Sequence, residues 1–125
     1  MLTKILYLSL GGSAGTLSRY WLSGVAQRLG GGSFPLGTVA VNMAGCLLFG
    51  AVWGFFETRM LPGSEIRLLV LTGFMGAFTT FSTYMFETAE LVKYGQMATA
   101  LLNVVGQSVA GLSLVLAGIA LGRLL

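Results

Sequence analysis

Residues 73–84 read Gly73-Phe74-Met75-Gly76-Ala77-Phe78-Thr79-Thr80-Phe81-Ser82-Thr83-Tyr84 and lie inside the third long apolar segment of the chain. The two glycines lower the cost of bending the backbone, and the four threonine and serine hydroxyls compete for backbone hydrogen bonds. The stretch therefore predicts a transmembrane helix that is broken near its middle. In lipid, such a break persists only where protein or a water-filled path satisfies the freed backbone groups, so we expect the functional site here.

The composition predicts an all-α integral membrane protein with a single four-helix domain over residues 1–125. The chain is 55% hydrophobic and only 9% charged, whereas soluble domains carry about 25% charged residues. The net charge of +3 is small and the basic residues are scattered, so nucleic acid is not an expected partner. With one cysteine and no histidine, the chain offers no obvious ligand set for zinc, iron or haem.

Four apolar segments are each roughly 20 residues long, which is enough to cross a bilayer. We interpret the first as a retained helix, because its apolar character runs too long for a signal peptide. Polar or glycine-rich turns separate the segments at 30–35, 57–65 and 93–96, and the short last turn predicts that the third and fourth helices are antiparallel neighbours. The predicted spans are residues 2–26, 37–56, 66–92 and 97–121.

The basic residues give only a weak preference for one orientation. Four spans put both termini on one side, flanked by Lys4, Arg59, Arg67 and Arg123, while Arg28 and Lys93 flank the other side. Because the positive-inside bias is small, we hypothesise that the chain inserts in both orientations and that two copies pair antiparallel.

Small residues in the first segment predict close helix packing. Gly11 and Gly15 form a GxxxG pattern, and Gly12 and Thr16 form a similar small-residue pair. Arg19 lies about two turns inside the same segment, where a charge is costly unless it snorkels or faces water. The side chain is long enough to snorkel or to line a water-filled vestibule, and the sequence leaves both interpretations open.

Carboxamide side chains occur inside two other segments. Asn42 lies in an apolar part of the second helix, where it could form an interhelical hydrogen bond or offer donors to a ligand. Asn103 and Gln107 are four residues apart and share a face of the fourth helix. That face predicts either a polar track for a solute or polar packing against another helix.

Aromatic side chains are spaced along the third segment. Phe74, Phe78 and Phe81 follow helical spacing, which is typical of a packing surface. Phe81 and Tyr84, however, alternate with hydroxyl side chains, and the electropositive edge of an aromatic ring can receive an anion in a dry place. Glu87 follows close to the helix end, where a solvated face is the default interpretation.

Three motifs together resemble one family. They are Gly12-x-x-Gly15-x-x-x-Arg19-Tyr20, then Gly37-Thr38-x-x-Val41-Asn42-x-x-Gly45, then Gly73-Phe74-x-Gly76-x-x-Thr79-Thr80-Phe81-Ser82-Thr83. In this order, over essentially the whole chain, they resemble the fluoride channels called Fluc or CrcB. The resemblance implies an antiparallel dual-topology homodimer in the plasma membrane with two fluoride pores.

The resemblance also implies roles for single residues. Arg19 and Glu87 match vestibule residues, and the backbone carbonyls of Gly76 and Thr79 match ligands of a structural sodium ion (Na⁺) at the dimer centre. The implied anion pathway comprises Asn42, Phe81, Ser82, Thr83, Tyr84 and Gln107. The chain departs from the usual family pattern at four positions, where phenylalanine, glycine, serine and serine are replaced by Tyr84, Ala77, Met85 and Gln107.

The expected function is therefore a passive, fluoride-selective channel that exports the anion and lowers its toxicity in the cytoplasm. A second candidate is a small dual-topology multidrug exporter, but the first helix has no carboxylate for proton exchange. A third is a non-transporting membrane subunit, which would not need the polar residues inside the last three helices. We do not expect an enzyme, because the chain has no serine–histidine pair, no paired carboxylates within the spans and no P-loop.

Overall fold

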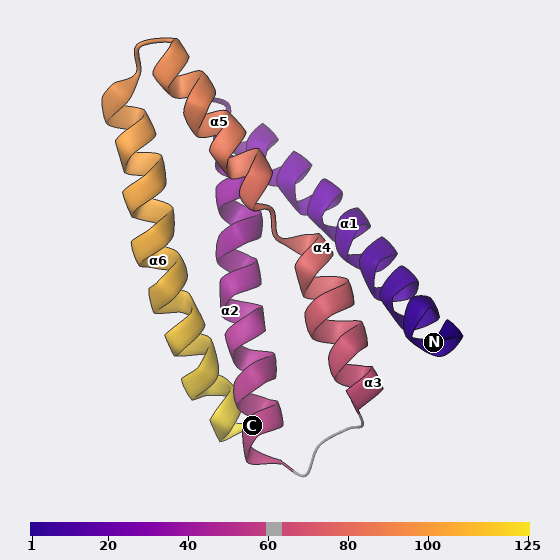
Figure 1. Cartoon of the computed structure of the whole chain (residues 1–125). Helices are drawn as coiled ribbons and strands as arrows, with labels where there is room; N and C mark the ends of the chain where they lie inside the picture. Colours follow the sequence, from indigo (N-terminus) through magenta and orange to yellow (C-terminus); the bar gives the residue numbers. More distant parts are fainter. Residues whose placement is uncertain (60–63) are drawn as a thin grey trace.

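The computed structural model describes residues 1–59 and 64–125, and in these ranges the regular structure is helical. The predicted turn at Pro62-Gly63 lies outside the described residues. Figure 1 shows the elements along the chain. In order, they are α1 (Leu2–Gly30), α2 (Leu36–Thr58), α3 (Ser64–Arg67), η1 (Leu68–Met75), α4 (Gly76–Phe78), α5 (Phe81–Lys93) and α6 (Met97–Leu124).

Three segments have the length and hydropathy of a membrane span. They are Leu36–Thr58, Glu65–Lys93 and Met97–Leu124, and their bounds lie close to those expected from the sequence. The chain is thus an all-helical, multi-pass membrane protein. α1 is long enough to cross a bilayer but is not one of these three, so its assignment as a fourth span stays a prediction.

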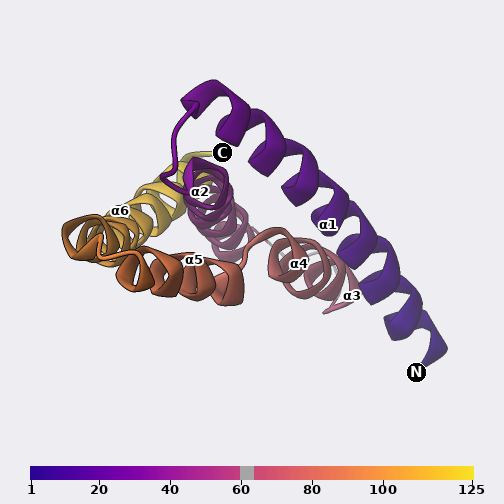
Figure 2. The same cartoon turned by 90° about the horizontal axis from the view of Figure 1, so that it is seen from above.

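The most extensive contact between elements joins α2 and α6, which lie side by side in all views (Figures 1 and 2). Glycines from both helices make this approach close: a Cβ on Gly50 or Gly54 of α2 would collide with backbone of α6, and a Cβ on Gly118 or Gly122 of α6 with backbone of α2. In lipid, where burial of apolar surface gives little driving force, such close backbone contact is a main source of helix association.

A second glycine contact joins α1 to the segment before the break. A Cβ on Gly11 would collide with the backbone oxygen of Leu69, and one on Gly15 with that of Phe74, which confirms the predicted close packing of this pair. The other small pair makes no such contact within the single chain, and its close packing stays a prediction. A Cβ on Gly12 would meet no described atom within 4 Å, and Thr16 is exposed, because both lie on a different face of α1.

The third apolar segment departs from α-helical geometry before it reaches the break. η1 is a π-helix of eight residues, a rare form that is frequently found at functional sites. It packs against α1 along much of its length. The wider winding was not expected from the sequence.

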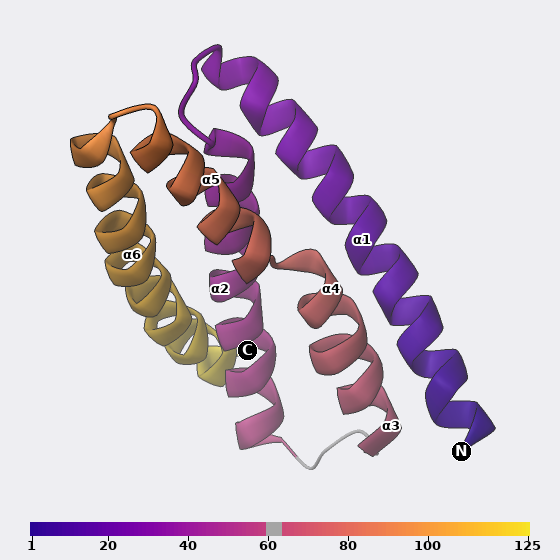
Figure 3. The ribbon, with the colours of Figure 1, turned by 45° about the horizontal axis from the view of Figure 1, so that its top comes forward.

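Beyond the break, the chain changes direction. Figure 3 shows α5 displaced sideways from α4, with the connecting backbone between them. α5 continues toward the short turn before α6 and contacts α6 there, as the sequence predicted for antiparallel neighbours. Both termini lie toward one end of the bundle, and the α1–α2 and α5–α6 connections lie toward the other end (Figure 1).

One side chain organises the α1–α2 connection. The Gln27 carboxamide donates to the backbone oxygens of Gly32 (3.0 Å) and Phe34 (3.1 Å), and it accepts from the Gly37 backbone N–H (3.0 Å). Gly31 ends α1 in the left-handed conformation (φ 61°), which favours glycine. The connection is therefore fixed by a residue that lies inside the preceding helix.

The α2–α6 contact predicts a difference between two glycines of α6. A methyl group on Gly118 would collide with the Leu47 oxygen and lie 2.8 Å from the Ala51 nitrogen, whereas one on Gly106 would meet no described atom within 4 Å. We expect Gly118→Ala to lower the unfolding temperature in detergent, since overpacking costs about 1–3 kcal/mol. Gly106→Ala is the matched control and should be neutral or stabilising by up to about 1 kcal/mol. Equal unfolding temperatures for the two variants would contradict this packing.

Candidate anion-binding site at the helix interruption

The site is built on two residues with extended backbone between α4 and α5. Thr79 has φ −82° and ψ 159°, and Thr80 has φ −147° and ψ 112°. The Met75 oxygen accepts from both the N–H and the hydroxyl of Thr79, each at 3.1 Å, so α4 closes on this residue. The two residues lie within the stretch that the sequence singled out.

Thr80 begins α5. Its hydroxyl accepts from the Thr83 backbone N–H at 3.3 Å and donates to the Thr83 hydroxyl at 2.9 Å. Threonine is a favoured N-cap residue, because its side-chain oxygen satisfies a helix N–H that has no partner within the helix. The Thr80 hydroxyl therefore caps the first turn of α5.

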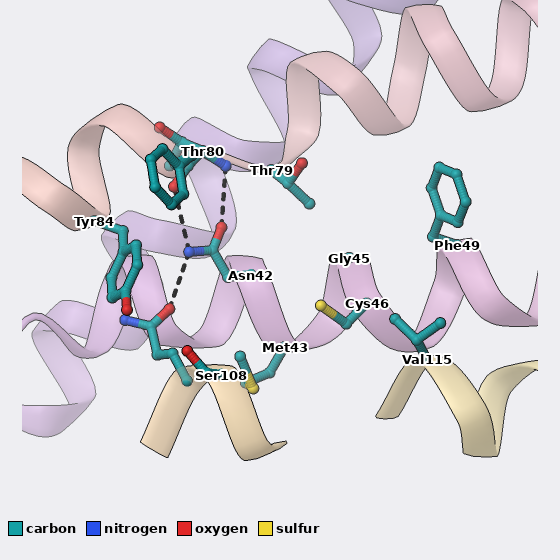
Figure 4. A pocket seen from close by; sticks show the side chains of 12 residues that line it. Asn42, Met43, Gly45, Cys46, Phe49, Thr79, Thr80, Tyr84, Ser108 and Val115 are labelled. Atoms are coloured by element: carbon teal, nitrogen blue, oxygen red, sulfur yellow. Dashed lines mark hydrogen bonds between the residues drawn. The ribbon is translucent and has the colours of Figure 1, made fainter. Parts of the chain in front are cut away.

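Asn42 of α2 satisfies the backbone of the interruption. Its Oδ1 accepts from the Thr80 N–H at 3.0 Å, and its Nδ2 donates to the Thr80 oxygen at 3.3 Å. Nδ2 also donates to Oε1 of Gln107 on α6 at 3.0 Å, and the dashed lines in Figure 4 mark these bonds. Of the two interpretations offered by the sequence, the interhelical hydrogen bond is present in the structure. The role of Asn42 as a donor to an ion stays a prediction.

These groups line a cavity of about 320 Å³ between α2, α5 and α6. Its polar lining residues are Asn42, Thr79, Thr80, Tyr84, Gln107 and Ser108, and mainly apolar residues form the rest of the wall (Figure 4). The structure therefore brings together four of the predicted pathway residues, namely Asn42, Phe81, Tyr84 and Gln107.

The two aromatic residues of this cavity meet edge to face. The ring centroids of Phe81 and Tyr84 are 5.8 Å apart, with an interplanar angle of 65°. Tyr84 is buried and its hydroxyl donates to the Val104 oxygen of α6 at 3.3 Å. Phe81 is 74% exposed in the single chain, although it also lines the cavity.

The other two predicted pathway residues, Ser82 and Thr83, do not line the Asn42 cavity. Thr83 lines a second cavity, whereas Ser82 is exposed on α5 and lines none of the three described cavities. The role of Ser82 in anion transfer stays a prediction.

The two predicted vestibule residues line different cavities. Arg19 is half-buried beside a cavity of about 370 Å³ that Thr38, Thr80 and Thr83 also line. Glu87 lines a third cavity, of about 400 Å³, and its Oε1 accepts from the Thr38 hydroxyl at 2.7 Å. Thr38 lines the second and third cavities, and Thr80 lines the first and second, so neighbouring cavities share walls.

The two residues predicted to hold a cation have different surroundings: Thr79 is part of the interruption and lines the Asn42 cavity, whereas Gly76 lies in α4. Gly76 is exposed, and a Cβ on it would meet no described atom within 4 Å. Thr79 is half-buried, and its methyl group packs closely on Gly45 of α2, where a larger residue would collide with it. The absence of a side chain at Gly45 therefore lets the interruption lie directly on α2.

Sequence analysis gave no role to two polar residues of the site. Thr38 is a helical turn before Asn42 and on the same face, which is a signal that could have identified it. Thr88 accepts from Nδ2 of Asn103 at 2.9 Å and donates to the Tyr84 oxygen at 2.8 Å. No sequence pattern indicates this pairing, because it depends on how α5 meets α6.

Fold and site together define a class: a small, multi-pass helical membrane protein with a polar cavity at an interrupted helix. The family model for the CrcB-like protein, Camphor Resistance (CrcB), matches residues 6–119. The chain belongs to this family.

Curated relatives resemble the chain over nearly its full length. A protein of Maridesulfovibrio salexigens is 58% identical over 98% of this chain and 97% of its own. Proteins of Solidesulfovibrio magneticus and Nitrosococcus oceani are 49% and 46% identical over the full length of both chains. All three relatives are named fluoride-specific ion channel FluC.

The N-cap of α5 gives a prediction that is independent of transport. Thr80→Val removes the oxygen that accepts from the Thr83 N–H and should destabilise the protein by about 1 kcal/mol. Hydrogen exchange at the Thr83 amide, measured by NMR in detergent, should become faster. Thr80→Ser retains the oxygen and should exchange as the wild type does. Unchanged protection in Thr80→Val would show that the cap does not hold this turn.

Proposed function

We propose that this chain is a passive, fluoride-selective ion channel of the plasma membrane, which exports fluoride and reduces its toxicity in the cytoplasm. The observation that carries the proposal is the Asn42 amide, fixed at a helix interruption beside two aromatic edges, in a chain whose relatives are named fluoride-specific channels.

Fluoride is small and strongly hydrated, so a pore has to replace its water with short hydrogen-bond donors. Asn42 Nδ2 donates to the Thr80 oxygen at 3.3 Å, slightly longer than the usual range of about 2.7–3.2 Å for such a bond. An anion in the cavity would accept this hydrogen most readily, because the bond that it replaces is the weakest of those made by Asn42. The Asn42 bonds at 3.0 Å to Gln107 and Thr80 would keep the amide in place.

Ring edges supply the second kind of donor. Phe81 and Tyr84 meet edge to face at an angle of 65°, so part of one electropositive edge points at the partner's face and the other edge hydrogens remain available to an anion. A wall of this kind attracts an anion without binding it as tightly as a full charge would. Larger halides would fit the narrow path poorly, because selection in such a pore depends on size and on donor number.

Arg19 supplies positive charge where ions would enter. A basic side chain beside a cavity raises the local anion concentration, and the Arg19 cavity shares Thr80 with the cavity of Asn42. The driving force is the membrane potential, which is worth about 2.3 kcal/mol per charge per 100 mV. Hydrogen fluoride crosses lipid as a neutral acid and ionises inside, so a selective exit for the anion lowers its concentration.

The functional unit that we propose is an antiparallel, dual-topology homodimer. Phe81 is 74% exposed in the single chain, and so are other large apolar residues on α1 and α6. A second copy would cover part of this surface and complete the wall opposite Phe81. The weak bias of the basic residues permits both orientations in one membrane.

A structural Na⁺ is part of this proposal. Gly76 has open space beside its backbone, so another chain could approach there, and carbonyl oxygens next to a helix interruption are suitable ligands for a hard cation. The Gly76 and Thr79 carbonyls of two copies would together supply the ligands. When bound, the ion would offset the partial negative charge of those oxygens and link the two subunits.

The expected alternative, a small multidrug exporter, gains no support from the relatives. Their names give one substrate, fluoride.

Fluoride efflux from liposomes tests the function directly. We expect vesicles that contain the purified protein to release fluoride much faster than empty vesicles, measured with a fluoride electrode after a potassium ionophore sets the potential. Vesicles loaded with chloride should release that ion no faster than the empty control. A wild-type rate equal to that of empty vesicles would overturn the proposal.

The role of Phe81 predicts a specific loss of flux. Phe81→Ile keeps an apolar side chain but removes the electropositive edge, so efflux should fall about fivefold to tenfold, the factor for about 1–1.4 kcal/mol. Leu102→Ile on α6 is the control, since Leu102 is also an exposed apolar residue but lines none of the three described cavities. Equal rates for the two variants would remove Phe81 from the pathway.

A further inference from the structure

A single row of hydrogen bonds connects the interruption to the second turn of α5 through side chains of α2 and α6. Its five bonds run from Thr80 N–H to Asn42 Oδ1 (3.0 Å), Asn42 Nδ2 to Gln107 Oε1 (3.0 Å), Gln107 Nε2 to Asn103 Oδ1 (2.9 Å), Asn103 Nδ2 to Thr88 Oγ1 (2.9 Å) and Thr88 Oγ1 to the Tyr84 oxygen (2.8 Å).

Every bond in the row has the same direction. A backbone N–H can only donate and a backbone oxygen can only accept, so Thr80 and Tyr84 fix the polarity at the two ends. Each carboxamide between them presents its oxygen toward Thr80 and its nitrogen toward Thr88. Turning one amide over would place donor against donor on one side and acceptor against acceptor on the other.

The middle of the row is closed to solvent. Asn103 is 1% exposed and Gln107 is 8% exposed, so water would not readily replace a partner that either of them loses. Buried polar groups that lose a partner pay their full desolvation cost. When one member of the row loses a hydrogen bond, its neighbour therefore has to reorient, because water does not replace the missing partner.

We propose that Thr88 and Asn103 are positioning residues that set the orientation of the Asn42 amide. Among the described residues, Asn42 and Gln107 line the cavity, whereas Thr88 and Asn103 do not. Their side-chain connection to the Asn42 amide runs through Gln107, and Thr88 also donates to the backbone oxygen of Tyr84. The effect on flux rests on the proposed function, while the effect on the amide does not.

The mechanism depends on the Thr88 hydroxyl. Without it, Asn103 Nδ2 has lost its acceptor and the amide is free to rotate, so Gln107 no longer has a fixed acceptor for its Nε2. Gln107 Oε1 then ceases to hold one hydrogen of Asn42 Nδ2 in place. The donor that faces the cavity becomes disordered, although no residue of the cavity wall has been changed.

Side-chain amide NMR tests the orientation directly, because Asn42 and Asn103 are the only asparagines of the chain. Selective ¹⁵N-asparagine labelling of detergent-solubilised protein gives two side-chain NH₂ signals, and a nuclear Overhauser contact with the Thr80 backbone amide, which bonds to Asn42, identifies that of Asn42. In Thr88→Val the Asn42 signal should move by more than its linewidth. In Thr88→Ser it should stay at its wild-type position. Ser113→Ala, which removes an exposed hydroxyl bonded only to the Val109 oxygen, is the control.

Efflux measurements add a functional readout. Thr88→Val should slow fluoride efflux by about threefold to tenfold, the range expected for the loss of one net hydrogen bond. Thr88→Ser should restore the wild-type rate within about twofold. With Asn42→Ala already present, Thr88→Val should cause no further slowing, because its effect passes through Asn42.

Three outcomes would overturn the proposal. The Asn42 signal could stay in place in Thr88→Val, the two substitutions could slow efflux additively, or Thr88→Ser could fail to restore the signal. If Thr88→Val does not fold, Asn103→Leu replaces it, and its single asparagine signal should be displaced from the wild-type Asn42 position. The two readouts also separate this inference from the proposed function. If the Asn42 signal moves in Thr88→Val but the wild-type protein shows no fluoride efflux, the positioning role is supported and the proposed function is rejected.

Discussion

The pairing of the Asn42 carboxamide with both backbone groups of Thr80 is the interaction on which the rest of the structure depends. A span with two extended residues leaves an N–H and an oxygen without helical partners, and lipid offers nothing to satisfy them. Asn42 meets both with one side chain, as a neighbouring strand would, at 3.0 and 3.3 Å. Without this partner, the chain at Thr79 and Thr80 would be driven back toward continuous helix, and the cavity would close.

Two close helix contacts hold this pairing in position. α2 is fixed to α6 by glycines of both helices, and α1 is fixed to η1 by Gly11 and Gly15. The interruption lies between these pairs, where Gly45 admits the methyl group of Thr79. The close packing thus lies at the α2–α6 and α1–η1 contacts, and the irregular backbone lies between them. The irregular part carries the polar groups.

Much of this arrangement could be predicted from the sequence. Hydropathy and turn residues placed the helices within a few positions, and the Gly11–Gly15 spacing predicted a real contact. Hydroxyls and glycines marked the stretch that contains the extended residues. The common face of Asn103 and Gln107 also follows from spacing, and the structure joins the two by a bond of 2.9 Å.

Other features could not be predicted, because they depend on distances between helices. Local spacing does not tell which helices pair most closely, so the α2–α6 contact was missed. The Gly12–Thr16 pair has the same pattern as Gly11–Gly15 but faces elsewhere. The π-helical winding of η1 and the bond from Thr38 to Glu87 likewise depend on tertiary packing. Dimer, cation and fourth span stay predictions that a single chain does not test.

The row from Thr80 to Tyr84 has a consequence for what the protein excludes. Membrane pumps move protons along chains of aspartate, glutamate and histidine, which gain and lose a hydrogen near neutral pH. A carboxamide holds both of its hydrogens under those conditions, so three of them in series form a polar path that cannot relay a proton. A cell that depends on its proton gradient can therefore keep such a row in its membrane without dissipating the gradient through it.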